Sequence, residues 1–185
     1  MESLIIRITK NLKITKRNLL LSGLAMSVFF IIFLVLNWIH IDKIHLNPLN
    51  QFSVGATLNA FEDLILVIAG YLVVSVIPHM IFTKLLLFIE VTMMLGGISY
   101  TILALSSGNL LTCILRLIRQ LDYIILIYML SLVSIQTIYN NRFQNYDNYF
   151  IRWCSSLNAS LSKKWIKLVF LVLVYWVTST LTLPY

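Results

Sequence analysis

The stretch from Leu19 to Trp38 reads LLLSGLAMSVFFIIFLVLNW and contains no charged residue. An α-helix of about twenty residues extends about 30 Å, the thickness of the hydrocarbon core of a bilayer. Because a backbone in lipid must satisfy its own hydrogen bonds, this run predicts a membrane-spanning helix. The apolar run is longer than that of a signal peptide, and no small-residue cleavage site follows it. We therefore expect an anchor that stays in the membrane.

The composition indicates that lipid surrounds most of the chain. Of its 185 residues, 59% are hydrophobic and 11% are charged, whereas soluble domains average about 45–50% and about 25%. So few charges cannot cover the surface of a soluble globular enzyme. Disorder requires low hydrophobicity and high net charge. The composition therefore excludes both a soluble globular enzyme and a disordered chain.

Further apolar runs predict additional spans. Together with residues 19–38 we expect transmembrane helices at about 61–78, 85–105, 123–138 and 166–182. Pro78 marks the end of the second run. The runs are continuous rather than alternating, which is typical of helices and not of barrel strands. The predicted fold is all-α: a single integral membrane domain over residues 1–185, with a bundle of five transmembrane helices and amphipathic interfacial helices.

The distribution of lysine and arginine predicts the orientation, because cytoplasmic loops carry an excess of these residues. With the N-terminus inside, the outer side holds only Lys43, Arg116 and Arg119. The cytoplasmic side then holds Arg7, Lys10, Lys13, Lys16, Arg17, Lys84, Arg142, Arg152, Lys163, Lys164 and Lys167. We expect a multi-pass protein of the plasma membrane with a cytoplasmic N-terminus and an extracytoplasmic C-terminus.

Two segments on the cytoplasmic side are predicted to be interfacial helices. Residues 5–17 have the pattern of a basic helix in the headgroup region. Residues 143–161 carry an apolar stripe at helical spacing, formed by Phe143, Tyr146, Phe150, Trp153, Leu157 and Leu161. Its aromatic members, Phe143, Tyr146, Phe150 and Trp153, are candidates for contact with a partner.

The polar segment before the fourth span has two possible structures. Thr112, Arg116, Arg119 and Asp122 recur at helical spacing, and neither proline nor glycine separates them from the span. Residues 110–121 are therefore either an interfacial helix on the outer side or the top of a long helix whose polar face enters the bundle. The face either lines a polar cavity or extends to the headgroups.

Glu90 lies inside the third predicted span, and an ionisable group at that depth is a functional candidate. One interpretation makes it a proton or cation site, or a gating pair with Arg116 or Arg119. The other, which we favour, is an internal ion pair or hydrogen bond that fixes helix packing. Gly96 and Gly97 follow in the same span and permit close helix approach.

The motifs of known membrane and nucleotide chemistries are missing. The sequence has no HExxH, no GxSxG, no facing aspartate pair and no Walker A motif. Cys113 and Cys154 do not have a metal-ligand spacing. We expect no enzyme activity and no catalytic, cofactor or metal site. The formal charge of +7 is better explained by anionic lipids than by nucleic acid.

From Phe61 to about Ile138 the chain resembles the stage II sporulation protein M family. The shared features are a span ending at Pro78, a short turn with Thr83-Lys84, a span with Gly96-Gly97, an outer turn over 106–109 and a polar helix entering the next span. Many members have His-Gly followed by Glu before that span, where this chain has Arg119-Gln120-Leu121-Asp122.

The resemblance implies a non-catalytic membrane subunit of a larger assembly. We therefore expect a scaffold or accessory subunit of a bacterial envelope or peptide (bacteriocin-type) export complex. The alternatives are a permease subunit served by a separate ABC-type ATPase, or a membrane immunity protein against a secreted peptide. The expected partners are membrane lipids, a second copy or sister subunit and, for the permease, the ATPase.

Overall fold

The computed structural model describes residues 8, 10–40, 49, 52–106, 110–144 and 147–182. Its helices are α2 (Lys16–Ile39), α3 (Val54–Val76), α4 (Met80–Leu103), η2 (Ala104–Ser106), α5 (Leu110–Asn141), α6 (Tyr149–Leu161) and α7 (Trp165–Thr182). Within these residues, α2, α3, α4, α5 and α7 are long and apolar enough to cross a membrane. The predicted all-α fold with five spanning helices is confirmed.

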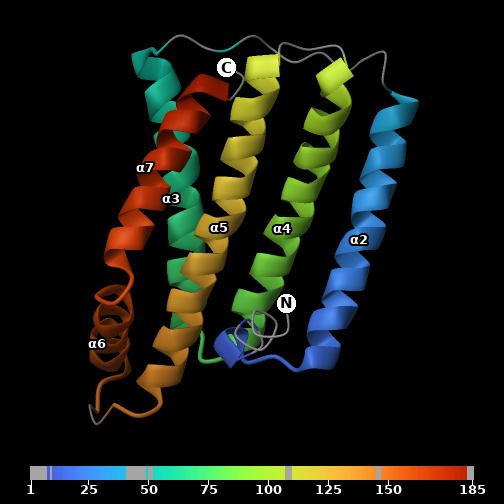
Figure 1. The fold of residues 1–185 in the computed structure, drawn as a ribbon. Helices are drawn as coiled ribbons and strands as arrows, with labels where there is room; N and C mark the ends of the chain where they lie inside the picture. The colour runs from blue at the N-terminus through green and yellow to red at the C-terminus, as the bar shows by residue number, and fades with distance from the viewer. Residues whose placement is uncertain are drawn as a thin grey trace.

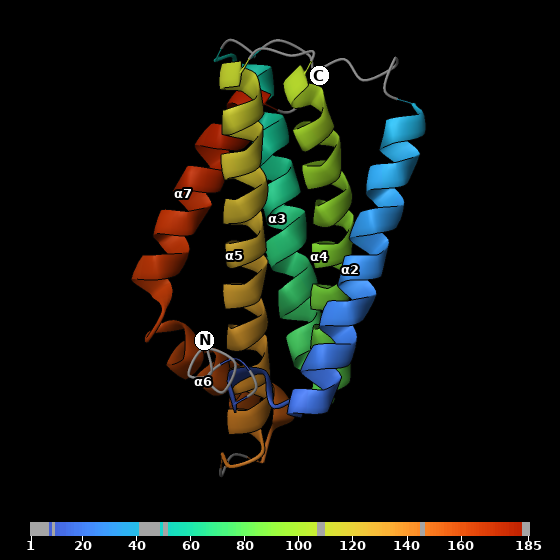
Figure 2. The same cartoon turned by 45° about the vertical axis from the view of Figure 1, so that its right-hand side comes forward.

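Helix α5 forms the centre of the bundle (Figures 1 and 2). It packs against α3, α4, α6 and α7, and α4 in turn separates it from α2. Helix α2 lies at the rim and has no buried residue, whereas α5 is buried along most of its length. The first spanning helix begins and the last one ends at opposite ends of the bundle, as an odd number of spans requires.

Small polar side chains occupy much of the interior, and large apolar ones face outward. Thr137 is fully buried and donates to the carbonyl of Val133 at 2.8 Å, so its hydroxyl needs no partner outside its own helix. Ser134 donates to the Tyr71 carbonyl at 3.0 Å and joins α5 to α3. Leu24 is 65% exposed. This distribution suits a bundle whose solvent is lipid, because small residues let helices approach closely.

The polar segment before the fourth span belongs to the long helix α5. The helix runs through 32 residues without a break, about 48 Å at 1.5 Å per residue. Thr112, Gln120 and Asp122 are buried. The prediction of a separate interfacial helix over 110–121 is therefore wrong, and the alternative of a long helix with its polar face in the bundle is correct. Continuous helix propensity with no proline or glycine explains the outcome.

Helix α3 begins well before the predicted residue 61. Ser53 is its N-cap and its side chain accepts from the amide of Ala56 at 3.1 Å, which satisfies one of the free donors of the first turn. The helix ends at Val76, because Ile77 is extended before Pro78. The early start places Glu62 and Asp63 inside the helix rather than at its edge.

The N-terminal segment is not one helix over 5–17. Residues 1–7 and Thr9 lie outside the described residues, and the helical backbone before α2 ends at Leu12. Lys13 has φ 53°, a left-handed conformation that stops an α-helix, and α2 starts after the N-cap Thr15. Leu12 is buried against Leu132 and Ile135 of α5, so this segment is bound to the end of the bundle.

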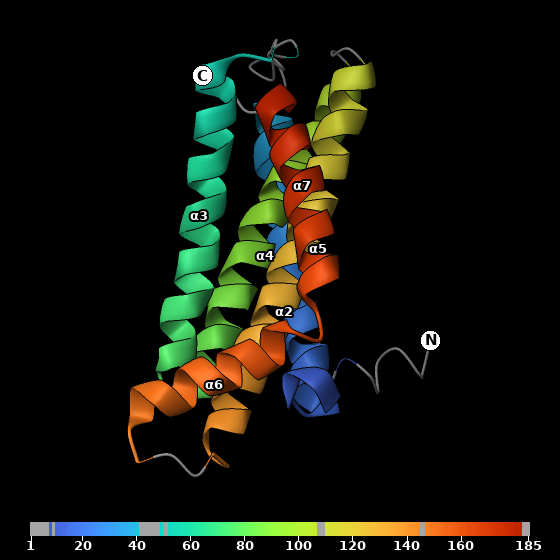
Figure 3. The same cartoon turned by 90° about the vertical axis from the view of Figure 1, so that its left-hand side faces the viewer.

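Helix α6 crosses the same end of the bundle (Figure 3). It covers Tyr149–Leu161 only, because Asn148 caps it by accepting from the amide of Phe150 at 2.8 Å. Phe143 precedes the helix, contrary to the predicted range 143–161, and Tyr146 lies outside the described residues. The Trp153 indole donates to Ser75 Oγ at 3.0 Å and attaches α6 to α3.

Candidate functional site

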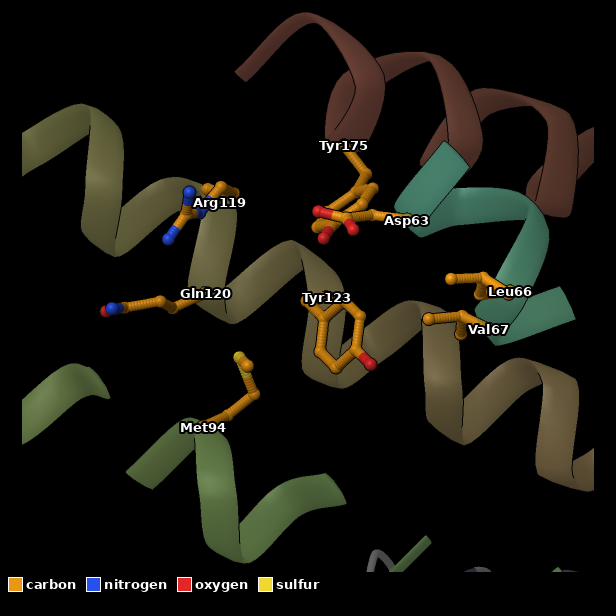
Figure 4. Close-up of a pocket in the computed structure, with 8 residues that line it drawn as sticks. All are labelled: Asp63, Leu66, Val67, Met94, Arg119, Gln120, Tyr123 and Tyr175. Carbon is orange, nitrogen blue, oxygen red and sulfur yellow. The ribbon is translucent and has the colours of Figure 1, made fainter. Parts of the chain in front are cut away.

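A polar cavity of about 320 Å³ lies between α3, α4, α5 and α7 (Figure 4). It combines two ionisable side chains with an amide and two tyrosines inside an otherwise apolar wall. The lining residues are Asp63, Leu66, Val67, Met94, Arg119, Gln120, Tyr123 and Tyr175. The cavity is large enough for several water molecules or a small polar molecule.

Arg119 and Asp63 approach the cavity from facing helices at the same depth. Each lies nine residues from the upper end of its helix, or about 14 Å below it. The Asp63 carboxylate and the Tyr175 hydroxyl are both close enough to act electrostatically on the guanidinium. Arg119 Nη1 is nevertheless buried without a hydrogen-bond partner among the described residues. A donor in this position is satisfied by water or by a polar ligand.

Gln120 lines the cavity and joins α5 to α4. It is 4% exposed, and its Nε2 donates to Thr101 Oγ1 at 3.2 Å. The contact requires a glycine opposite, because a Cβ at Gly97 would lie 2.9 Å from Gln120 Nε2. Gly96 instead faces the ring of Phe33 on α2. The glycine pair thus lets α4 approach neighbours on two sides, as its sequence predicts.

Glu90 lies deeper in the bundle and is linked to the cavity by a tyrosine. The Tyr71 hydroxyl donates to Glu90 Oε2 at 3.3 Å. The Tyr123 hydroxyl is close enough to interact with the same carboxylate. Tyr123 also lines the cavity, and its ring lies 5.3 Å from that of Tyr175, centroid to centroid. A hydrogen bond therefore holds Glu90, as in the interpretation we favour.

The residues of the predicted polar face of α5 lie against two different helices, α4 and α7. Arg116 lies near Tyr100 of α4 and Cys113 of its own helix. Arg119 lines the cavity, and Asp122 is near enough to Tyr175 of α7 to act on its hydroxyl. Asp122 is 8% exposed, and its Oδ2 has no hydrogen-bond partner in the described part of the chain. Arg119 thus faces the bundle interior rather than the headgroups.

Sequence reasoning missed the other polar residues of this site, Asp63, Tyr71, Tyr123 and Tyr175. Asp63 falls near the start of the predicted span 61–78, whereas the N-cap signal of Ser53 places it deeper in the helix. The three tyrosines carry hydroxyls within apolar runs, a signal for buried hydrogen bonding.

Comparison with protein-family models, with curated proteins and with solved structures finds no match for the chain.

Proposed function

We propose that the chain is a non-catalytic subunit or scaffold of a bacterial envelope or peptide-export complex in the plasma membrane. The resemblance to the stage II sporulation protein M family supports an assembly role. The observation that carries the proposal is α6, which is attached to the bundle through part of its apolar stripe and leaves Phe150, at the N-terminal end of that stripe, exposed. Such a helix offers a partner a preformed contact surface.

Several contacts fix α6 against the spanning helices. Besides the Trp153 bond to Ser75, the Tyr149 hydroxyl donates to the Val76 carbonyl, and Leu157 and Leu161 pack against the main core. The N-terminal end of the same stripe is open, since Phe150 is 60% exposed although its ring lies 5.5 Å from that of Trp153, centroid to centroid. Phe143, just before the helix, is exposed as well.

The charges support a cytoplasmic location for this end of the bundle. Among the described residues, the cations near the α6 end are Lys10, Lys13, Lys16, Arg17, Lys84, Arg142, Arg152, Lys163, Lys164 and Lys167. Arg116 and Arg119 lie in the other half of α5. By the positive-inside rule, α6 faces the cytoplasm and α7 ends outside.

Pull-down from mild detergent tests this proposal. The tagged chain is expected to recover a stoichiometric partner, and Phe150→Asp is expected to lose it, because the charge cannot be buried in an apolar contact. Asn158→Asp adds the same charge at an exposed position of the same helix and serves as the matched control. Failure to recover any partner with the unchanged chain, or full recovery with Phe150→Asp, would contradict the proposal.

A permease subunit with a separate ABC-type ATPase is the second candidate. The polar cavity favours it, because Arg119 and Asp63 would bind a charged group along a path through the membrane. In this case α6 couples to the ATPase. We expect Arg119→Gln to abolish substrate-stimulated ATP hydrolysis while ATPase binding persists, and Phe150→Asp to abolish both. Unchanged stimulation in Arg119→Gln excludes the cavity as the path.

The third candidate is an immunity protein that shields a membrane target. Expression of the chain alone in a sensitive host distinguishes this function from the other two, because neither a scaffold nor a permease half protects a cell without its partners. Survival in the presence of the secreted peptide supports immunity, and killing at the usual dose excludes it.

A further inference from the structure

A second cavity, of about 390 Å³, lies at the α6 end of the bundle and is separate from the site around Arg119. Side chains from three parts of the chain meet there: the segment before α2, the last turns of α5, and the turn between α6 and α7. The lining residues are Lys10, Asn11, Lys13, Leu132, Ile135, Gln136, Tyr139, Asn140 and Lys164. Three of these side chains are lysines.

Specific contacts hold the lysines at this cavity. Burial of Leu12 against α5 fixes the segment that carries Lys10 and Lys13. The Lys13 ammonium lies 3.8 Å from the centroid of the Tyr139 ring. The backbone carbonyl of Lys13 accepts a hydrogen bond from Lys84 Nζ at 2.8 Å. Across the cavity, Lys164 Nζ donates to Gln136 Oε1 at 3.1 Å. Lys13 and Lys164 are therefore held in place by contacts of their own, and Lys10 lies on the segment that Leu12 anchors.

The lining of this cavity carries positive charge without a negative counterpart. No aspartate or glutamate is among the described residues that line it, so nothing in this lining balances the charges of its three lysines. Burial and the positive charge of Lys163 lower the pKa of Lys164 below the ordinary lysine value. In addition, Lys13 has a left-handed backbone that favours glycine. A bound anion would balance the positive charge of the lining.

We propose that this cavity binds a phosphate group, carried by an anionic lipid headgroup or by a soluble phosphate ester. Lys10, Lys13 and Lys164 supply the charge. The side-chain amides of Asn11 and Asn140 supply further hydrogen-bond donors for the phosphate oxygens. The cavity lies where the spanning helices end, which is the level of the headgroups, and basic pockets at that level are suited to anionic lipids.

Binding of phosphatidylglycerol, compared with phosphatidylcholine, tests the proposal on the full chain in neutral detergent, by native mass spectrometry. The probe variant is Lys13→Gly with Lys164→Gln, which removes two charges while relieving the left-handed backbone and keeping a polar side chain beside Gln136. The control is Lys163→Gln with Lys167→Gln, which removes two exposed charges that do not line the cavity. Equal thermal midpoints without lipid show that both variants are folded.

We expect the unchanged chain to retain phosphatidylglycerol preferentially. Each cavity lysine removed weakens binding about fivefold, so the probe variant loses about 25-fold, and the control less than about threefold. Equal retention of the two lipids, or equal losses in probe and control variants, would overturn the proposal. Millimolar inorganic phosphate distinguishes the sources: competition indicates a soluble phosphate ester, and undisturbed retention indicates the lipid.

Discussion

At the residue scale, neutral hydroxyl groups accompany the charged groups inside the bundle. The carboxylate of Glu90 receives a hydrogen bond from Tyr71, whose side chain is 1% exposed. Asp63 likewise lies near Tyr175. A charged group in a low-dielectric interior requires such donors. Tyr71 depends on Glu90 in turn, because its buried hydroxyl donates its hydrogen bond to that carboxylate.

Replacement of Glu90 tests this mutual dependence. Glu90→Gln keeps an acceptor for the Tyr71 hydroxyl, so we expect little change in the thermal midpoint in detergent. Glu90→Leu leaves the hydroxyl unpaired and is expected to destabilise the fold by about 1–3 kcal/mol. Adding Tyr71→Phe to Glu90→Leu should restore part of this loss. Additive losses in the double variant would show that the two side chains are not coupled.

The lowered pKa of Lys164 predicts a pH dependence for the basic cavity. Burial and Lys163 lower the pKa, whereas phosphate binds the protonated amine. Affinity for phosphatidylglycerol should therefore fall as pH rises, and should begin to fall at a lower pH than ordinary lysines would give. Lys163 is the neighbouring charge that acts on Lys164, and Gln136 of α5 accepts its hydrogen bond. Lys10 and Lys13 of the N-terminal segment and Tyr139 of α5 line the same cavity.

Lys164→Arg separates this effect from the titration of the other lysines. Arginine stays charged throughout the accessible range, so the variant should hold its affinity to a higher pH than the unchanged chain. Binding is measured from pH 7 to about 10.5 in both. Coincident pH profiles would exclude Lys164 as the group responsible.

At the element scale, each helix begins and ends for a local reason, but its neighbours are set by packing. Ser53 caps the start of α3, and Pro78 follows its end. Both residues are recognisable helix boundary signals in the sequence. The existence of each span is also predictable, because a crossing needs about twenty apolar residues, but α3 and α5 extend beyond their predicted ranges. The approach of α3 to α7 is different: it brings Asp63 near Tyr175, and no periodicity within either segment encodes that contact.

The two adjacent glycines of α4 provide a matched test of helix approach. Gly97→Ala places a Cβ 2.9 Å from Gln120 Nε2, so the amide must move and its bond to Thr101 is lost. We expect a loss of about 1 kcal/mol, seen as a lower thermal midpoint. Gly96→Ala meets Phe33 at an ordinary 3.5 Å and should be neutral or slightly stabilising. A lower thermal midpoint for Gly96→Ala than for Gly97→Ala would contradict the packing described.

At the scale of the whole molecule, the bundle has two chemically different polar regions. One is the cavity between the helices around Arg119, and the other is the basic end that carries Lys13, Lys164 and α6. Hydropathy and charge were sufficient to predict five spans and the basic end, because lipid imposes both patterns. They were insufficient for the cavity, which depends on side chains from α3, α4, α5 and α7 meeting at one depth.

The most direct test of the whole arrangement is the accessibility of cysteines at the two ends of the bundle. In a background with Cys113→Ser and Cys154→Ser, His40→Cys marks the end of α2 and Ser162→Cys marks the end of α6; both positions are exposed. A membrane-impermeant maleimide should label His40→Cys in intact cells and Ser162→Cys only after the membrane is opened. Labelling of both in intact cells, or the reverse pattern, would contradict a five-span bundle with α6 in the cytoplasm.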